Sequence, residues 1–196
     1  MIPRLPLLPN RVQLLQRVKP TRSKWARSPR PDAIERAGPG DESVWDYPRP
    51  PSVGDTNDRL RVECEGHVIA ETGRALIVRE TAGAPVPYFP PNDVRTDCLT
   101  PTGHVTICEW KGAAVHFNLM LAGCRIEHAA YTYPDPLDDL DRGFTRIAGW
   151  FAFYSATLDC FIGDEAVRPQ PGGYYGGWVV DGIKGPIKGA PGSEGW

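Results

Sequence analysis

The sequence of 196 residues has no apolar run that approaches the roughly 18–20 residues needed to span a bilayer. It also lacks a C-x-x-C pair, and its five cysteines are an odd number at irregular spacing, which argues against a secreted disulfide framework. The net charge of only −2 excludes a uniformly basic nucleic-acid-binding protein. These absences predict a soluble, cytoplasmic protein with reduced thiols, no membrane span and no nucleic-acid partner.

Long helices are disfavoured as well, because 21 glycines and 21 prolines interrupt the chain and neither residue suits a helix interior. Several segments alternate between apolar and polar residues, or are held extended by proline, as strands do. These are residues 59–65, 67–71, 75–80, 84–89, 105–111, 114–121 and 125–132, with 150–154 and 158–162 as a further hairpin. One body helix is predicted at 137–147, where Leu137, Leu140, Phe144 and Ile147 recur every three to four residues. The sequence therefore predicts a mainly β, mostly antiparallel single domain, either a barrel or a pair of sheets.

The first 40 residues form a basic arm. They contain nine lysines and arginines against two acids, a charge of +7, whereas residues 41–196 contain thirteen against twenty-two, a charge of −9. Six prolines within the first 31 residues predict an arm without packed structure. Its spacing allows one amphipathic helix over residues 10–19, with Val12, Leu15 and Val18 on one face. An arginine-bearing helix without acids is typical of a mitochondrial presequence, and a disordered extension without a role is the alternative.

The domain is predicted to occupy residues 41–196, with its core at about 58–163 and a glycine-rich tail at 164–196. Nine glycines and four aromatic residues follow position 171 in this tail. Four rings left in water would expose a sizeable apolar patch. We therefore expect the tail to dock on the core with Trp178 buried.

Seven sequence runs resemble domain-of-unknown-function family 427, and together they extend over nearly all of residues 41–196. They are ESVWDYPRPP (42–51), GHVIAET (66–72), RETAGAPVPYFPPNDV (79–94), TICEWKG (106–112), YTYPDP (131–136), FAFY (151–154) and PQPGGYYGGW (169–178). The resemblance implies a β-tent fold, two antiparallel sheets meeting at an angle, as in methionine sulfoxide reductase B and the thalidomide-binding domain of cereblon. Relatives of that fold often hold zinc between two C-x-x-C knuckles. This chain has none, so no metal and no other cofactor is predicted.

The family has also been labelled nucleotidyltransferase-like, and nucleotide transfer needs convergent carboxylates for Mg²⁺. The one carboxylate cluster is Asp135, Asp138, Asp139 and Asp141. Acids at the start of the predicted helix are favoured by its macrodipole without any metal. The crowded histidines and cysteines, His104, His116, His128, Cys108 and Cys124, also show no recognisable metal-ligand spacing.

Thiol chemistry on Cys108 is a further alternative, because a nearby Lys111 ammonium would activate it. Residues three apart on a regular strand point to opposite faces, so this contact requires a twist or bulge at Gly112. A buried core thiol is the plainer interpretation.

The remaining hypothesis is a small-molecule site flanked by residues 106–112. Lys111 is its charged group, because a cation on an apolar face requires a partner or an anionic ligand. Aromatic walls favour a planar ligand or a cation. The candidate residues are Lys111, Glu80, Tyr88, Trp110, Tyr133 and Cys108. The sequence thus predicts binding of a small planar or anionic ligand, with no reaction assigned. The alternatives are a structural Lys111–Glu80 pair, and a protein-interaction or structural module that is a monomer or a homodimer.

Overall fold

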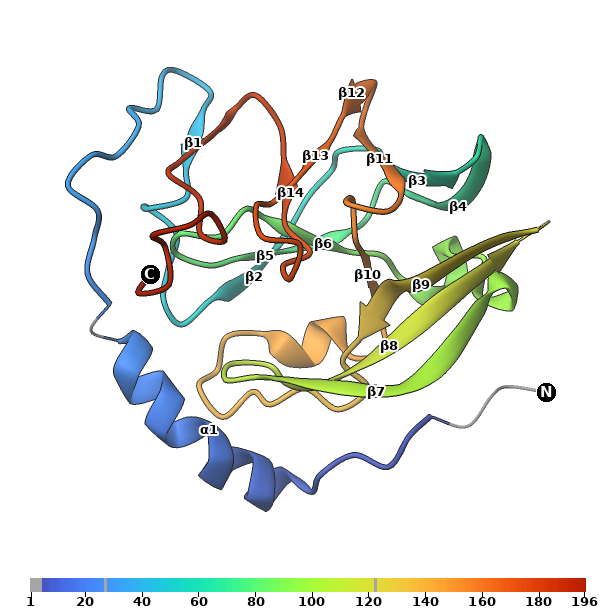
Figure 1. Cartoon of the computed structure of the whole chain (residues 1–196), viewed down its shortest axis with the longest axis horizontal. Helices are drawn as coiled ribbons and strands as arrows, with labels where there is room; N and C mark the ends of the chain where they lie inside the picture. The colour runs from blue at the N-terminus through green and yellow to red at the C-terminus, as the bar shows by residue number, and fades with distance from the viewer. Residues whose placement is uncertain (1–4, 27, 122) are drawn as a thin grey trace.

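The computed structural model describes residues 5–26, 28–121 and 123–196 (Figure 1). Three antiparallel sheets make up the body. The first contains β7 (Leu99–Cys108), β8 (Gly112–Leu121), β9 (Cys124–Thr132) and β10 (Phe151–Phe153). The second contains β12 (Glu165–Ala166), β11 (Asp159–Ile162), β3 (Leu60–Cys64) and β4 (His67–Thr72), and the third β2 (Ser52–Asp55), β5 (Leu76–Arg79) and β6 (Val86–Tyr88). The predicted mainly β, antiparallel fold is confirmed, and within the described residues the sheets stay open rather than closing into a barrel.

Two small ladders and three short helices complete the body. Strand β1 (Glu42–Ser43) pairs in parallel with β15 (Ile183–Lys184), and β13 (Arg168–Pro169) pairs with β14 (Trp178–Val179). The 3₁₀ helices are η1 (Pro91–Asp93), η2 (Thr96–Cys98) and η3 (Phe144–Ile147).

Alternation along the strands builds the core. In β3 the side chains of Leu60, Val62 and Cys64 are buried while their neighbours are half-buried, as expected of a strand with one inner face. Strand β10 also forms a bridge from Phe151 to Phe89, directly after β6, and so connects the first sheet to the third. The body therefore packs as one unit around these shared apolar residues.

Two predictions about local structure are wrong. Residues 137–147 form a turn followed by η3 rather than a helix, because the Asp138 carboxylate accepts the Arg142 and Thr145 backbone N–H groups. Gly143 at φ +78° then breaks any helical continuation. Segments 150–154 and 158–162 do not pair with each other, since β10 pairs with β9 and β11 pairs with β3.

The arm contains α1 (Arg11–Trp25), which is longer than the predicted helix and lies along β8. Asn10 caps it by accepting the Gln13 N–H at 2.9 Å. Leu14 and Val18, one turn apart, are buried against the first sheet. This packing differs from the expectation of an arm without tertiary contacts. Residues 1–4 and 27 of the arm lie outside the described part.

No helix in the described ranges is long and apolar enough to cross a membrane.

The tail contacts the core through Trp178. Trp178 is only 1% exposed, and its indole Nε1–H donates to the Phe153 carbonyl at 3.2 Å. Its backbone N–H donates to the Pro85 carbonyl at 2.8 Å. The preceding Gly177 has no room for a side chain, because a Cβ there would lie 2.1 Å from Gln170 Oε1. The boundaries between arm, core and tail stay a prediction.

Candidate functional site

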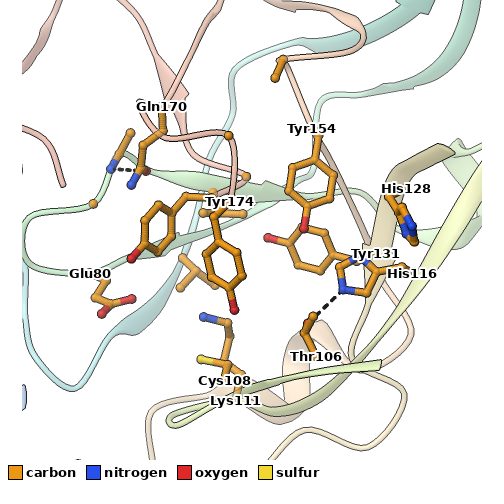
Figure 2. A pocket seen from close by; sticks show the side chains of 18 of the residues that line it. Glu80, Thr106, Cys108, Lys111, His116, His128, Tyr131, Tyr154, Gln170 and Tyr174 are labelled. Atoms are coloured by element: carbon orange, nitrogen blue, oxygen red, sulfur yellow. Dashed lines mark hydrogen bonds between the residues drawn. The ribbon is translucent and has the colours of Figure 1, made fainter. Parts of the chain in front are cut away.

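A cavity of about 570 Å³ opens between the first sheet, the end of β5 and the tail (Figure 2). Side chains from β7, β8 and β9 line one side, and Glu80, just after β5, lies on the other. The loop between β13 and β14 covers it with Tyr174 and Tyr175. Residues far apart in sequence therefore meet around one space, which lies within the usual size range of small-molecule sites.

The inner wall is aromatic. Tyr131 lies near the end of β9 and Tyr133 directly follows the strand, and their ring centroids are 6.0 Å apart. Tyr154 follows β10, and its ring lies 5.2 Å from that of Tyr131. Burial raises the pKa of Tyr131 and Tyr133 well above the ordinary value, and it raises that of Tyr154 to about 12. All three phenols are therefore neutral at pH 7 and offer hydroxyl groups and ring faces to a ligand.

Lys111 lies in the turn between β7 and β8 rather than within a strand, and its side chain lines the cavity. Residues 109–111 connect β7 to β8, and Cys108 pairs directly with Gly112 across the hairpin. Gly112 has φ +92°, and a Cβ there would lie 3.1 Å from Leu137 Cγ. The turn places Lys111 beside Cys108, and both line the cavity.

Regular strand alternation over residues 105–111 would put Val105 and Ile107 on the same face as Lys111. Both pack against the cluster of Leu14 and Val18 from α1, and Ile107 also lines the cavity. Strand alternation ends at the hairpin turn, so it does not govern the direction of Lys111. Contact between Cys108 and Lys111 requires a bend at Gly112, and the hairpin turn provides this bend.

The Lys111 side chain is buried, and its ammonium has no hydrogen-bond or ion-pair partner within the described residues. The residue is 7% exposed, and its Nζ lies 5.6 Å from the centre of the Tyr133 ring. Among the described residues, no hydrogen bond or ion pair reaches Nζ. Burial lowers the pKa of Lys111, but the nearby Cys108 and Glu80 raise it more, so its pKa lies above the ordinary value. Lys111 is therefore a cation facing the cavity.

Glu80 pairs with a different lysine. Lys188 Nζ lies 3.0 Å from Glu80 Oε1, and both side chains are largely buried. Burial raises the pKa of Glu80, but Lys188 and Lys111 lower it more, and the net shift is downward. The direct Lys111–Glu80 pair expected as the alternative is thus replaced by Lys188–Glu80, which leaves Lys111 free among the described groups.

Three of the four histidines in the chain gather at one side of the cavity. His104, His116 and His128 lie on β7, β8 and β9 with ring centroids 4.8, 5.0 and 5.7 Å apart. The strand registers shift between Pro101 and Val105 and between Phe117 and Leu119, beside these histidines. Such bulges redirect side chains, and His128 has the unusual φ of +51°.

His116 is the buried member of this histidine cluster. It is 4% exposed, and its Nε2 shares a 2.9 Å hydrogen bond with Thr106 Oγ1. Burial, together with His104 and His128, lowers its pKa to about 4. His116 is therefore neutral at pH 7. Within residues 5–26, 28–121 and 123–196, no three His, Cys, Asp or Glu side chains are arranged to hold a metal ion.

The loop over the cavity is built from glycines around two tyrosines. A Cβ on Gly176 would lie 3.0 Å from the Tyr131 hydroxyl, so the loop approaches the aromatic wall closely. At the base of the loop the Gln170 side chain accepts the Ala84 N–H and donates to the Lys188 carbonyl, both at 3.0 Å. Tyr174 is 64% exposed, and its hydroxyl end points toward Lys111.

Four of the six predicted site residues line this cavity, namely Lys111, Glu80, Cys108 and Tyr133. Tyr88 lies behind the wall, with no exposed surface and its ring 6.2 Å from Tyr131. Trp110 does not line the cavity and instead faces α1, where the Arg22 guanidinium lies 5.8 Å from its ring. Sequence reasoning did not include Lys188, Tyr131, Tyr154 or the histidines in the site. The even 12-residue spacing of His104, His116 and His128 is the signal that could have identified the cluster.

Three of the four aspartates considered for nucleotide transfer have structural partners. Asp139 accepts from Arg22 at 2.6 Å, and Asp135 lies 3.5 Å from Arg11. Asp138 caps the turn before η3. The contacts of Asp139 and Asp135 connect α1 to the body, and these structural roles explain three of the four acids without a metal.

Comparison with known proteins identifies a family. The model of a domain of unknown function, DUF427, matches residues 52–164, which is more than half of the chain. The match includes Glu80, Lys111 and the three clustered histidines, whereas α1 and the loop with Tyr174 lie outside it. No curated protein matches the chain. The sequence runs and the family match agree, and the chain belongs to the DUF427 family.

Proposed function

We propose that this protein binds a small planar anion in the cavity, with Lys111 as the anchor for the anionic group. The observation that carries this proposal is the buried Lys111 side chain, whose ammonium faces the cavity without a partner among the described residues. A buried charge is costly unless it is paired, and a ligand carboxylate or phosphate would supply the missing partner.

The surrounding charges favour an anion at Lys111 and not elsewhere. Glu80 is already neutralised by Lys188 at 3.0 Å, and Glu127 at the edge of the cavity pairs with Arg125 at 3.1 Å. Glu109 is the remaining carboxylate of the lining, and it lies in the turn toward α1. The anionic end of the ligand would thus enter deeply, past the rim.

The aromatic wall supports a planar body for the ligand. Tyr131, Tyr133 and Tyr154 present neutral rings next to Lys111, and Tyr174 covers them from the tail. Aromatic contacts contribute about 0.5–1.5 kcal/mol per pair beyond area burial. An aromatic carboxylate matches both the cation and the rings, and no reaction follows from this arrangement.

The test compares benzoate with its neutral isostere benzamide by isothermal titration calorimetry. We expect wild-type protein to bind benzoate more tightly, and Lys111→Met to abolish that preference while benzamide binding remains. Lys19→Met, an exposed lysine on α1, is the matched control and should behave like wild type. Equal affinity for both probes in the wild type, or a preference that survives Lys111→Met, would refute the proposal and favour a protein-interaction role.

A further inference from the structure

Two cysteines from different sheets lie in direct contact. Cys64 ends β3, Cys124 begins β9, and their Sγ atoms are 3.0 Å apart although 60 residues separate them in sequence. This is about 1 Å longer than the S–S bond of a disulfide. Figure 1 shows the β3–β4 hairpin and the tips of β8 and β9 on the same side of the molecule.

The other cysteines have different surroundings. The Cys98 thiol donates to the Arg95 carbonyl at 2.8 Å, Cys108 lines the cavity, and Cys160 is buried in the core. All five are free thiols in the structure. Within the described residues, Cys64 and Cys124 are the one thiol pair in hydrogen-bonding contact.

We propose that Cys64 and Cys124 form a reversible disulfide that joins the second sheet to the first, with a low-molecular-weight disulfide such as oxidised glutathione as the oxidant. The site is separate from the cavity, so it stands independently of the proposed ligand. Joining the two sheets would restrict their separation at this edge of the body.

The two thiols have different roles in this exchange. Cys124 is half-buried, whereas Cys64 is 3% exposed. Burial and the neighbouring Cys124 raise the pKa of Cys64 to about 12, so Cys64 is a poor first nucleophile. The accessible Cys124 therefore reacts first.

The steps balance as thiol–disulfide exchange. The Cys124 thiolate attacks one sulfur of oxidised glutathione, which forms a mixed disulfide and releases one glutathione thiolate. Cys64 then loses its proton and attacks Cys124 Sγ, which forms the protein disulfide and releases the second glutathione. Two protein thiols are oxidised and one glutathione disulfide is reduced to two thiols.

The test treats the native full chain with oxidised glutathione, followed by thiol counting and peptide mass mapping. We expect two of the five thiols to disappear, one peptide pair linked through Cys64 and Cys124, and recovery of both thiols with dithiothreitol. The urea midpoint of the oxidised protein should exceed that of the reduced protein.

Two variants make the order of attack visible. Cys64→Ser should stop at glutathione bound to Cys124, because the resolving thiol is gone, and Cys124→Ser should remain unmodified at Cys64. Cys98→Ser is the control and should still form the crosslink. A stable glutathione adduct on wild-type Cys124 without a protein disulfide, a crosslink between other cysteines, or no reaction at all would overturn the proposal.

Discussion

Replacing Trp178 by alanine tests whether the tail is part of the folded core. The indole is 1% exposed, with its ring 5.8 Å from that of Phe89. Burial of a large aromatic side chain removes about 150–250 Å² from water, which at about 25 cal/mol per Å² corresponds to about 4–6 kcal/mol. Because that area is an upper estimate, and because measured Trp→Ala costs are about 3–5 kcal/mol, we expect a loss of about 4 kcal/mol.

The lost hydrogen bond adds to this cost. The indole N–H donates to the Phe153 carbonyl at 3.2 Å within the core, and leaving that carbonyl unpaired costs about 1 kcal/mol. Trp178→Phe is the matched control, because it keeps a ring against Phe89 and loses mainly this bond. We expect it to cost about 1–2 kcal/mol.

The measurement is urea unfolding followed by far-UV circular dichroism, because removing a tryptophan changes the fluorescence signal. A domain of ordinary stability has about 5–15 kcal/mol in total, so Trp178→Ala should remove from about a third to all of it and lower the unfolding midpoint in proportion. A loss below about 1 kcal/mol for Trp178→Ala would show that the tail does not stabilise the core, and the docking argument would be wrong.

Two further predictions concern the histidine cluster and the arm. His116 has a folded pKa of about 4, below its ordinary value, so the unfolded chain binds the proton first as the pH falls, and stability decreases between about pH 6.5 and 4. We expect a loss of up to about 3 kcal/mol across this window. His116→Asn should flatten the profile in urea unfolding from pH 7 to 5, and an unchanged slope would contradict the assignment. Arg22→Ala removes the 2.6 Å bonds from α1 to the Glu109 carbonyl and to Asp139, so we expect faster tryptic cleavage within α1 and a loss of about 1–2 kcal/mol. Cleavage of Arg22→Ala at the wild-type rate would mean that these bonds do not hold the helix.

Strand positions could be predicted where one face of a strand is buried. In β3 the alternation of Leu60, Val62 and Cys64 with charged residues is unambiguous, because a one-residue slip would expose all three. The helix expected at 137–147 could not be distinguished in this way. Its apolar spacing fits a helix, but the Asp138 side chain competes for the backbone N–H groups and favours a turn.

The surroundings of Lys111 could be predicted only in part from the sequence. Strand alternation suggests an apolar face around it, but Lys111 lies in the hairpin turn before Gly112, and the turn directs its side chain into the cavity. Its expected partner Glu80 is bound by Lys188, which is 108 residues away in sequence. No local pattern reports a contact at that separation, so Lys188 could not be identified from sequence spacing.

The parallel pairing of β1 with β15 affects how the molecule is completed during synthesis. Glu42 pairs with Ile183, and Lys188 reaches Glu80, so both contacts join segments that are far apart in sequence. Contacts at such separation carry a large loop-closure cost and form late in folding. While the tail is still in the ribosome, Glu80 has no cationic partner from it and Tyr131 has no cover from Gly176. The cavity therefore reaches its full form only once residues 170–188 have been made and have docked on the body.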